Sequence, residues 1–262
     1  MLTTRVRTET EMAVAQGARP PYLERMEPAP VIHRHALSTR LWHWVTALSV
    51  IILLGSGLMI LNAHPHLYWG RYGANYDPAW FHVAWVFESG RVPGWLTIPE
   101  SYNLALARRW HLFFALVLAF ALLAFMIVSL INRHVQRDLR VRARDLSPRV
   151  LAHDAREHLA LRFHDPADPR AYNVFQKLSY VGVIFLALPG LILTGLAMSP
   201  GMDAAWPWLL DLFGGRQSAR SIHFILMIVI ALFIIVHLAL VVLAGVWNEV
   251  RSMVTGKWRV PE

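Results

Sequence analysis

Residues 221–247 read SIHFILMIVIALFIIVHLALVVLAGVW and contain no Asp, Glu, Lys or Arg. Because a helix of about 20 apolar residues crosses a bilayer core, this stretch predicts a transmembrane helix. It carries two histidines, His223 and His237, which are 14 residues apart. At about 3.6 residues per turn and 1.5 Å per residue, both rings face one side of the helix, roughly 21 Å apart. One helix therefore presents imidazoles at two depths of a membrane.

Three more uncharged apolar stretches predict further spans, at about 41–61, 110–131 and 178–198. The run at 41–61 is long, begins far from residue 1 and precedes no small-residue cleavage site, so it is not a cleavable signal. A chain that is 56% hydrophobic and 16% charged has the composition of a membrane protein. The fold predicted is an all-α membrane protein, a bundle of four transmembrane helices with a long loop between the first two.

The absence of cysteine excludes disulfides, cysteine-bound zinc, iron-sulfur clusters held by this chain and covalently attached c-type haem. The net charge of +8 does not indicate nucleic-acid binding, because the arginines lie between apolar runs rather than in one basic patch. A redox centre in this chain would need histidine ligands.

Basic residues predict the orientation. The segment before the first span, residues 133–177 and the carboxyl tail hold 19 of the 25 Lys and Arg. Since Lys and Arg near membrane ends stay on the cytoplasmic side, both termini and residues 133–177 are predicted cytoplasmic in a bacterial inner (plasma) membrane. Residues 62–109 and 199–220 are then periplasmic. The aromatic-rich segment 62–109 is either an interfacial or partner-docking surface or a folded loop that covers its own bundle.

Four histidines lie in or at the ends of the spans, and ionisable residues there are functional candidates by default. The predicted topology puts His111 beside His223 in the outer half of the bundle. It puts His43 beside His237 in the inner half. The competing explanation for each histidine is a hydrogen-bonded structural role.

Two histidines at each depth favour haem over a metal ion. Zinc takes three or four protein ligands, whereas haem needs only two axial imidazoles. The sequence therefore predicts two b haems, each between two histidines. Glycines in spans one and three either make room for haem or let the helices approach: Gly55, Gly57, Gly182, Gly190 and Gly195. GSGLMI at 55–60 and LTGLAM at 193–198 look alike, but no longer internal repeat is evident.

Arginines near the four histidines are candidate partners for haem propionates; they are Arg40, Arg108, Arg109 and Arg220. Membrane topology and snorkelling explain the same placements without haem.

Three features of the chain resemble the di-haem cytochrome b membrane subunits of formate dehydrogenases (the gamma subunit), nickel-iron hydrogenases and thiosulfate reductases. They are RLWHW at 40–44, RRWH at 108–111 and the histidine pair in span four. The resemblance covers roughly residues 33–250. It implies axial ligand pairs of His43 with His237 and of His111 with His223. The predicted spans and orientation divide the chain into a cytoplasmic extension at residues 1–35, the transmembrane cytochrome b domain at 36–250 and a cytoplasmic tail at 251–262. The extended amino terminus and the long loop at 62–109 depart from the compact formate-dehydrogenase subunits, so the resemblance does not specify the partner.

HPHLYWG at 64–70 and YNVFQKLSY at 172–180 look most like the thiosulfate-reductase type, with Val174 where that type usually has proline. The family reacts with quinone, ubiquinone or menaquinone, beside the cytoplasmic haem. This implies a quinone site near the start of span three. The candidate residues are Asn173, Gln176, Lys177 and Tyr180. The alternative role for them is helix entry or contact with lipid headgroups.

The function implied is an electron-transfer subunit of a respiratory-chain oxidoreductase, between a periplasmic molybdenum or iron-sulfur partner and membrane quinone. Such a subunit has no catalytic residue of its own for the partner's substrate. Two alternatives stay open: a self-sufficient di-haem quinone oxidoreductase such as a superoxide oxidase, and a haem-free membrane anchor or transporter.

Overall fold

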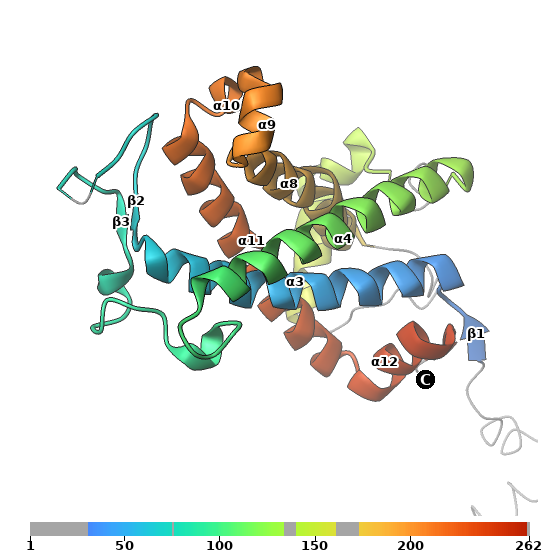
Figure 1. Cartoon of the computed structure of the whole chain (residues 1–262). Coiled ribbons are helices and arrows are strands. Elements are labelled where there is room, and N and C mark those ends of the chain that lie inside the picture. Colours follow the sequence, from blue (N-terminus) through green and yellow to red (C-terminus); the bar gives the residue numbers. More distant parts are fainter. Residues whose placement is uncertain (1–30, 75, 134–139, 161–172, 261–262) are drawn as a thin grey trace, which may run out of the picture.

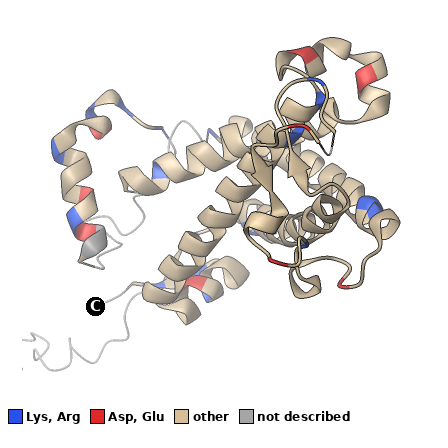
Figure 2. Cartoon of the chain, turned by 90° about the vertical axis from the view of Figure 1, so that its left-hand side faces the viewer, with Lys and Arg blue, Asp and Glu red and all other residues tan. Residues whose placement is uncertain are grey.

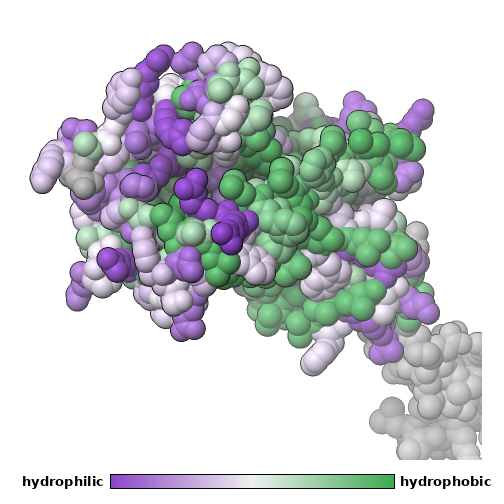
Figure 3. Space-filling model, viewed as in Figure 1, coloured by the Kyte–Doolittle hydropathy of each residue, from purple (hydrophilic) through white to green (hydrophobic). Residues whose placement is uncertain are grey.

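The computed structural model describes residues 31–74, 76–133, 140–160 and 173–260. Four helices in these ranges are long and apolar enough to cross a membrane: α3 (Leu37–Ala63), α4 (Leu104–Ile131), a third span over Val174–Ala197 and α11 (Arg216–Leu243). The four predicted spans are thereby confirmed as helices. Lys, Arg, Asp and Glu lie near the helix ends and in the connecting segments (Figure 2). Over the helices the visible surface is hydrophobic (Figure 3).

The bundle consists of two helix pairs, α3 with α4 and the third span with α11 (Figure 1). The third span is made of α7 (Val174–Val181), the π-helical turn η4 (Gly182–Ala187) and α8 (Leu188–Ala197). Pro189, at the start of α8, has no backbone N–H to donate, and the wider turn directly before it accommodates that break in regular helix geometry.

One apolar core joins all four spans. Its buried members come from each of them: Val50, Leu118, Leu122, Phe125, Ile184, Ala187, Leu188 and Ile230. Trp42 of α3 stacks on Phe125 of α4 with ring centroids 4.1 Å apart. The outward-facing side chains of the same helices are large and apolar, as expected of surfaces in contact with lipid.

Residues 62–109 fold against the bundle. Within them β2 (His66–Leu67) pairs antiparallel with β3 (Phe81–His82), followed by the 3-10 turns η1 (Val83–Trp85) and η2 (Gly94–Leu96). The carbonyl of Gly70 accepts from the backbone N–H groups of Gln217 and Ser218 in the first turn of α11, at 3.1 Å each. These N–H groups have no partner within the helix, so the loop caps α11.

Buried serines strengthen this attachment. Ser221 Oγ donates to the Tyr68 carbonyl at 2.6 Å and accepts from Trp80 Nε1 at 2.8 Å. Phe81 packs on Phe224 of α11 with ring centroids 4.8 Å apart. Trp85 and Trp95, by contrast, are 66% and 77% exposed. Part of the aromatic segment covers the bundle, and part faces outward.

The opposite end of the bundle is closed by segments near the two termini. β1 (Val31–His33) pairs antiparallel with β4 (Lys257–Arg259), beside α12 (Val246–Thr255). Trp258 is fully buried between them and donates to Glu249. We call this the terminus-side end and the end covered by residues 62–109 the loop-side end; they lie at opposite ends of α3 (Figure 1).

The helix boundaries differ slightly from those predicted. α11 ends at Leu243 rather than near Trp247, because Gly245 adopts φ 102° and turns the chain into α12. Residues 31–33 pair with the carboxyl-terminal strand, so the described part of the predicted amino-terminal extension packs on the predicted tail. The remaining short helices are η3 (Ala143–Leu146), α6 (Pro148–Leu159), α9 (Pro200–Ala205) and α10 (Pro207–Leu212).

Candidate functional site

The four histidines of the spans form two facing pairs. In the loop-side pair, His111 of α4 faces His223 of α11 with ring centroids 6.2 Å apart. In the terminus-side pair, His43 of α3 faces His237 of α11 at 6.3 Å. The ring planes cross at 56° in both pairs. The structure thus brings together the same partners that the sequence predicts, and α11 contributes one ring to each pair.

The spacing of the rings fits a metal held between two imidazoles. A ring nitrogen binds such a metal at about 2.0–2.1 Å and the ring centre lies about 1.2 Å further back, so two ligands place their centroids about 6.4–6.6 Å apart. The observed spacings, 6.2 and 6.3 Å, are close to this range. In the parts of the chain that the structure describes, no three or more His, Asp or Glu side chains gather as metal ligands. Two axial imidazoles and no further ligand suit haem, which supplies four nitrogens itself.

Neighbouring helices hold both rings of the loop-side pair. Ser56 Oγ of α3 lies 3.0 Å from His111 Nδ1, and Thr194 Oγ1 of α8 lies 2.9 Å from His223 Nδ1. Both hydroxyl-bearing residues are fully buried. Each loop-side histidine therefore has Nδ1 engaged by a hydroxyl group from the neighbouring helix.

The terminus-side pair is held differently. The buried His43 Nδ1 has no hydrogen-bond partner among the described residues. Trp44 packs edge-on against the His43 ring at 5.1 Å, and Phe233 stacks on His237 at 5.7 Å. Among the described residues, these two rings have aromatic contacts and no hydrogen bond to a hydroxyl group. Close by, outside the span, burial lowers the pKa of His35 to about 4, with Arg34 adding to the effect, so His35 is neutral at pH 7.

The glycines of spans one and three have separate roles. A Cβ on Gly57 would lie 3.3 Å from His111 Cε1, and one on Gly195 would lie 3.6 Å from His223 Cε1. A Cβ on Gly55 would meet Ile98 of the loop at 2.6 Å, and one on Gly190 would meet Leu226 of α11 at 2.8 Å. Two of these glycines therefore border histidine rings, and two permit close packing of protein against protein.

The four candidate arginines are not equivalent. Arg220 donates to the carbonyl oxygens of His64 and His66 in the loop, and Arg40 Nη1 donates to the Val254 carbonyl at 2.5 Å. Arg108 and Arg109 are exposed in the first turns of α4. Two arginines thus bind backbone carbonyls at the two ends of the bundle. Contact with haem propionates stays a prediction for all four.

The candidate quinone residues lie at the start of the third span. Asn173 and Gln176 form a capping box: Asn173 Oδ1 accepts from the Gln176 N–H at 2.9 Å, and Gln176 Oε1 accepts from the Asn173 N–H at 3.3 Å. Tyr180 packs against the common core, and Lys177 is half-buried. Helix capping explains the first two residues, and a quinone site stays a prediction for all four.

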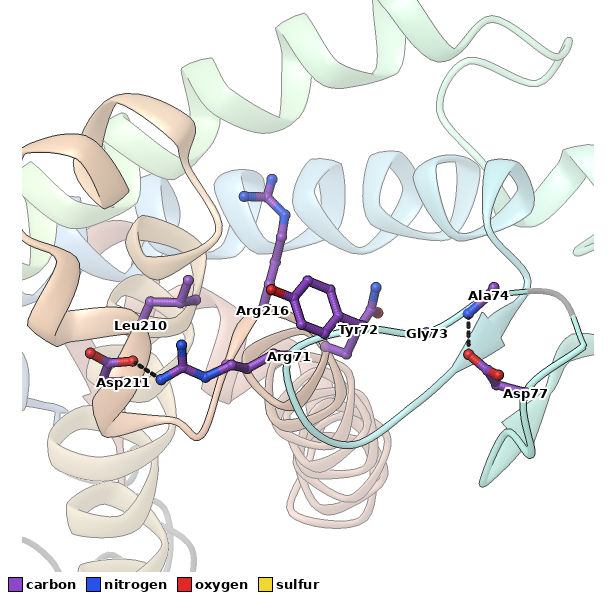
Figure 4. Close-up of a pocket in the computed structure, with 10 residues that line it drawn as sticks. Arg71, Tyr72, Gly73, Ala74, Asp77, Leu210, Asp211 and Arg216 are labelled. Atoms are coloured by element: carbon purple, nitrogen blue, oxygen red, sulfur yellow. Dashed lines mark hydrogen bonds and ion pairs between the residues drawn. The ribbon is translucent and has the colours of Figure 1, made fainter.

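A separate open pocket of about 480 Å³ lies between loop residues 71–74 with Asp77 and the start of α11 (Figure 4). Arg71 and Asp211 bridge its edge at 2.8 Å, with side chains 68% and 61% exposed. None of the four paired histidines lines this pocket, so it is a surface hollow distinct from the histidine sites.

Sequence reasoning missed Ser56 and Thr194. Single buried hydroxyls are common in membrane helices and carry no signal alone. The short similarity between 55–60 and 193–198 could have indicated these two residues, because it aligns Ser56-Gly57-Leu58 with Thr194-Gly195-Leu196.

Four apolar helices with two facing histidine pairs define a helical membrane protein of the b-type cytochrome class. The model of the prokaryotic cytochrome b561 family matches residues 34–256, and the chain belongs to that family. It is accordingly a prokaryotic membrane protein of electron transport whose redox group is b-type haem, and the predicted family resemblance is confirmed.

Curated relatives are distant but match nearly full length. The chain is 24% identical over 248 residues to the probable Ni/Fe-hydrogenase B-type cytochrome subunit of Azotobacter vinelandii, covering 90% of this chain and 92% of the relative. It is 23% identical to the same subunit of Azotobacter chroococcum mcd 1, with the same coverage. It is 26% identical over 208 residues to the putative protein-methionine-sulfoxide reductase subunit YedZ1 of Azospira oryzae, covering 78% of this chain and 87% of the relative.

Proposed function

We propose that this chain is the di-haem cytochrome b subunit of a membrane oxidoreductase and transfers electrons between a periplasmic partner subunit and membrane quinone. The observation that carries the proposal is the pair of facing imidazoles at each end of the bundle, 6.2 and 6.3 Å apart and linked by α11. A haem-free anchor would not need two pairs with the spacing of axial ligands.

The protein's residues would bind and orient the haems. His111 and His223 would hold one, and His43 and His237 the other. When bound, b-type haem would supply one-electron chemistry, and two imidazoles at each site would leave no position for a substrate, which suits outer-sphere electron transfer. Because His223 and His237 share one helix, its rise sets the two sites roughly 21 Å apart along the membrane normal.

The loop-side end would face the periplasm. The segments near both termini and the connection after α4 hold most of the basic residues, which favours the cytoplasmic side for them. The loop-side haem would then be near the periplasmic surface, and the terminus-side haem near the cytoplasmic surface.

A partner is part of this proposal. The hydrogenase and methionine-sulfoxide-reductase relatives are both named as subunits, which supports a role inside a complex. With no cysteine, this chain has no thiolate to hold an iron-sulfur cluster, so a molybdenum or iron-sulfur subunit would supply the substrate chemistry. The exposed Trp85 and Trp95 at the loop-side end are suited to a docking surface, where aromatic residues are enriched.

Quinone would react near the terminus-side haem. Lys177 and Tyr180 are the stronger candidates there, because Asn173 and Gln176 already cap α7. The quinone is ubiquinone or menaquinone.

The test is a haem count and a quinol reaction on the purified full chain in detergent. We expect two low-spin b haems per chain in the pyridine haemochrome assay, and reduction of both by a quinol added to the oxidised protein. A haem-free protein from haem-sufficient cells would overturn the proposal. Rapid reduction by superoxide with ubiquinone as acceptor, in the absence of any partner, would instead favour the self-sufficient oxidoreductase.

A further inference from the structure

The hydroxyl groups beside the loop-side histidines have a defined hydrogen-bond direction. Ser56 Oγ lies 2.6 Å from the Ile52 carbonyl as well as 3.0 Å from His111 Nδ1. A hydroxyl has one proton, and a carbonyl can only accept, so that proton goes to Ile52. Ser56 Oγ therefore accepts at His111, which requires a ring proton on Nδ1.

The second loop-side histidine repeats this arrangement. Thr194 Oγ1 donates to the Gly190 carbonyl at 2.6 Å and accepts from His223 Nδ1 at 2.9 Å. Both rings thus carry a proton on Nδ1, and in an imidazole with one ring proton this leaves the lone pair on Nε2. That tautomer is the one in which Nε2 can coordinate iron.

A glycine follows each hydroxyl residue and borders the same ring. Gly57 lies against the Cε1 edge of His111 and Gly195 against the Cε1 edge of His223. The hydroxyl comes in each case from the helix packed alongside the ligand helix, α3 beside α4 and α8 beside α11. The two helix pairs of the bundle therefore present the same hydroxyl-glycine support to the two rings of one site.

The terminus-side pair provides the contrast. His43 Nδ1 is buried without a hydrogen-bond partner in the described ranges, and aromatic rings pack on both histidines. The support is specific to one site rather than general to histidines in this bundle.

We propose, resting on the haem binding of the proposed function, that Ser56 and Thr194 are positioning residues that orient His111 and His223 through Nδ1 and lower the midpoint potential of the loop-side haem. A hydrogen bond accepted from Nδ1–H makes Nε2 a stronger electron donor. A stronger donor stabilises the ferric over the ferrous state of the one-electron couple. Such a shift would favour electron transfer from the loop-side site towards the terminus-side site, relative to a chain that lacks these hydroxyl groups.

The experiment is a redox titration of the purified full chain, followed at the haem α-band. Ser56→Ala and Thr194→Val each remove one hydroxyl, and the double variant removes both. We expect a positive shift of the loop-side midpoint in each single variant, a larger shift in the double variant and no change at the terminus-side haem. Repeating the titration in a His237→Ala background leaves only the loop-side haem and assigns the shift.

Two controls separate the hydroxyl from general packing. Ser49 is also fully buried on α3 and donates to the Val45 carbonyl at 2.7 Å, but this hydroxyl bonds no histidine of the described segments. Ser49→Ala should leave both midpoints at the wild-type values. Thr194→Ser keeps the hydroxyl and should retain the wild-type potential.

The outcomes also separate this inference from the proposed function. A wild-type protein without haem overturns both. The inference alone is overturned if the wild type binds two haems and the midpoint potentials of Ser56→Ala and Thr194→Val equal those of Ser49→Ala. Equal shifts in midpoint potential at both haems also overturn it. Should the alanine variant not fold, Ser56→Cys makes the same test, because a thiol is a weak acceptor; a smaller positive shift is expected, and none overturns the inference.

Discussion

The two histidine pairs share their spacing and ring angle but differ in what surrounds them. The loop-side rings are held at Nδ1 by Ser56 and Thr194, whereas the terminus-side rings are packed against Trp44 and Phe233. Hydrogen bonds select a tautomer and tune ligand basicity, while apolar packing confines a ring without choosing between its nitrogens. Equal ring geometry therefore does not make equal sites, and the supporting residues distinguish the two ends.

The ends also differ in how they are closed. At the loop-side end, a long connection caps the first turn of α11 through Gly70 and buried serines. At the terminus-side end, α12 and a two-stranded sheet cover the start of α3, and Trp44 Nε1 donates to the Met253 carbonyl at 3.0 Å. A different part of the chain therefore packs over each end of the bundle: residues 62–109 at the loop-side end, and β1, β4 and α12 at the terminus-side end.

The largest expected effect is the loss of one haem at a time. His111→Ala should remove the loop-side haem and His43→Ala the terminus-side haem, each leaving roughly half of the pyridine-haemochrome signal, because bis-histidine haem depends on both axial ligands. His153→Ala, which replaces an exposed histidine of α6, is the control and should retain full haem content. Unchanged haem in either pair variant would refute the ligand assignment.

The next largest effect concerns the cover at the loop-side end. Ser221→Ala removes the partner of both the Tyr68 carbonyl and Trp80 Nε1, and each buried polar group left unpaired costs about 1–3 kcal/mol. We expect a lower melting temperature and faster proteolytic cleavage within residues 62–109.

Ser252→Ala is the matched change at the terminus-side end. Ser252 is equally buried, but its hydroxyl only donates to the Glu249 carbonyl within α12. Its effect should be smaller, at about 1 kcal/mol. Equal destabilisation by the two variants would show that the loop is not held through Ser221.

A smaller effect is expected where a ring borders a glycine. Gly57→Ala adds a methyl group 3.3 Å from His111 Cε1, so the gain in helix propensity should be offset by crowding of about 1 kcal/mol or more. Loop-side haem should be lost at a lower temperature while terminus-side haem is retained. Gly182→Ala meets no atom within 4 Å and is the control; weaker haem retention in that variant too would argue against crowding at His111.

The smallest effect should come from the exposed ion pair. Arg71 and Asp211 join the loop to α10 at 2.8 Å, yet both side chains are mostly in solvent. Exposed pairs contribute about 0–1 kcal/mol, so Asp211→Asn should change the melting temperature of the detergent-solubilised protein little. A loss as large as that of Ser221→Ala would mean that the surface pair, and not the buried serine, fastens the loop.

The sequence did not decide how the aromatic segment at residues 62–109 is placed. Its composition was compatible with both an exposed surface and a self-covering loop, and the fold uses both: Trp80 and Phe81 pack on α11, whereas Trp85 and Trp95 face outward. Aromatic residues favour buried and interfacial positions alike, so their number along the chain does not assign them.

The sequence by itself determined the four spans and the depths of their histidines, because apolar run length and helical rise are local properties of the chain. It also indicated the pairing of His111 with His223 and of His43 with His237 through the alternating direction of successive spans. Only the tertiary structure decided what supports each pair. Ser56 is 55 residues from His111 and Thr194 is 29 residues from His223. Such contacts arise from which helices pack side by side and at what rotation, and no local pattern of residues specifies either.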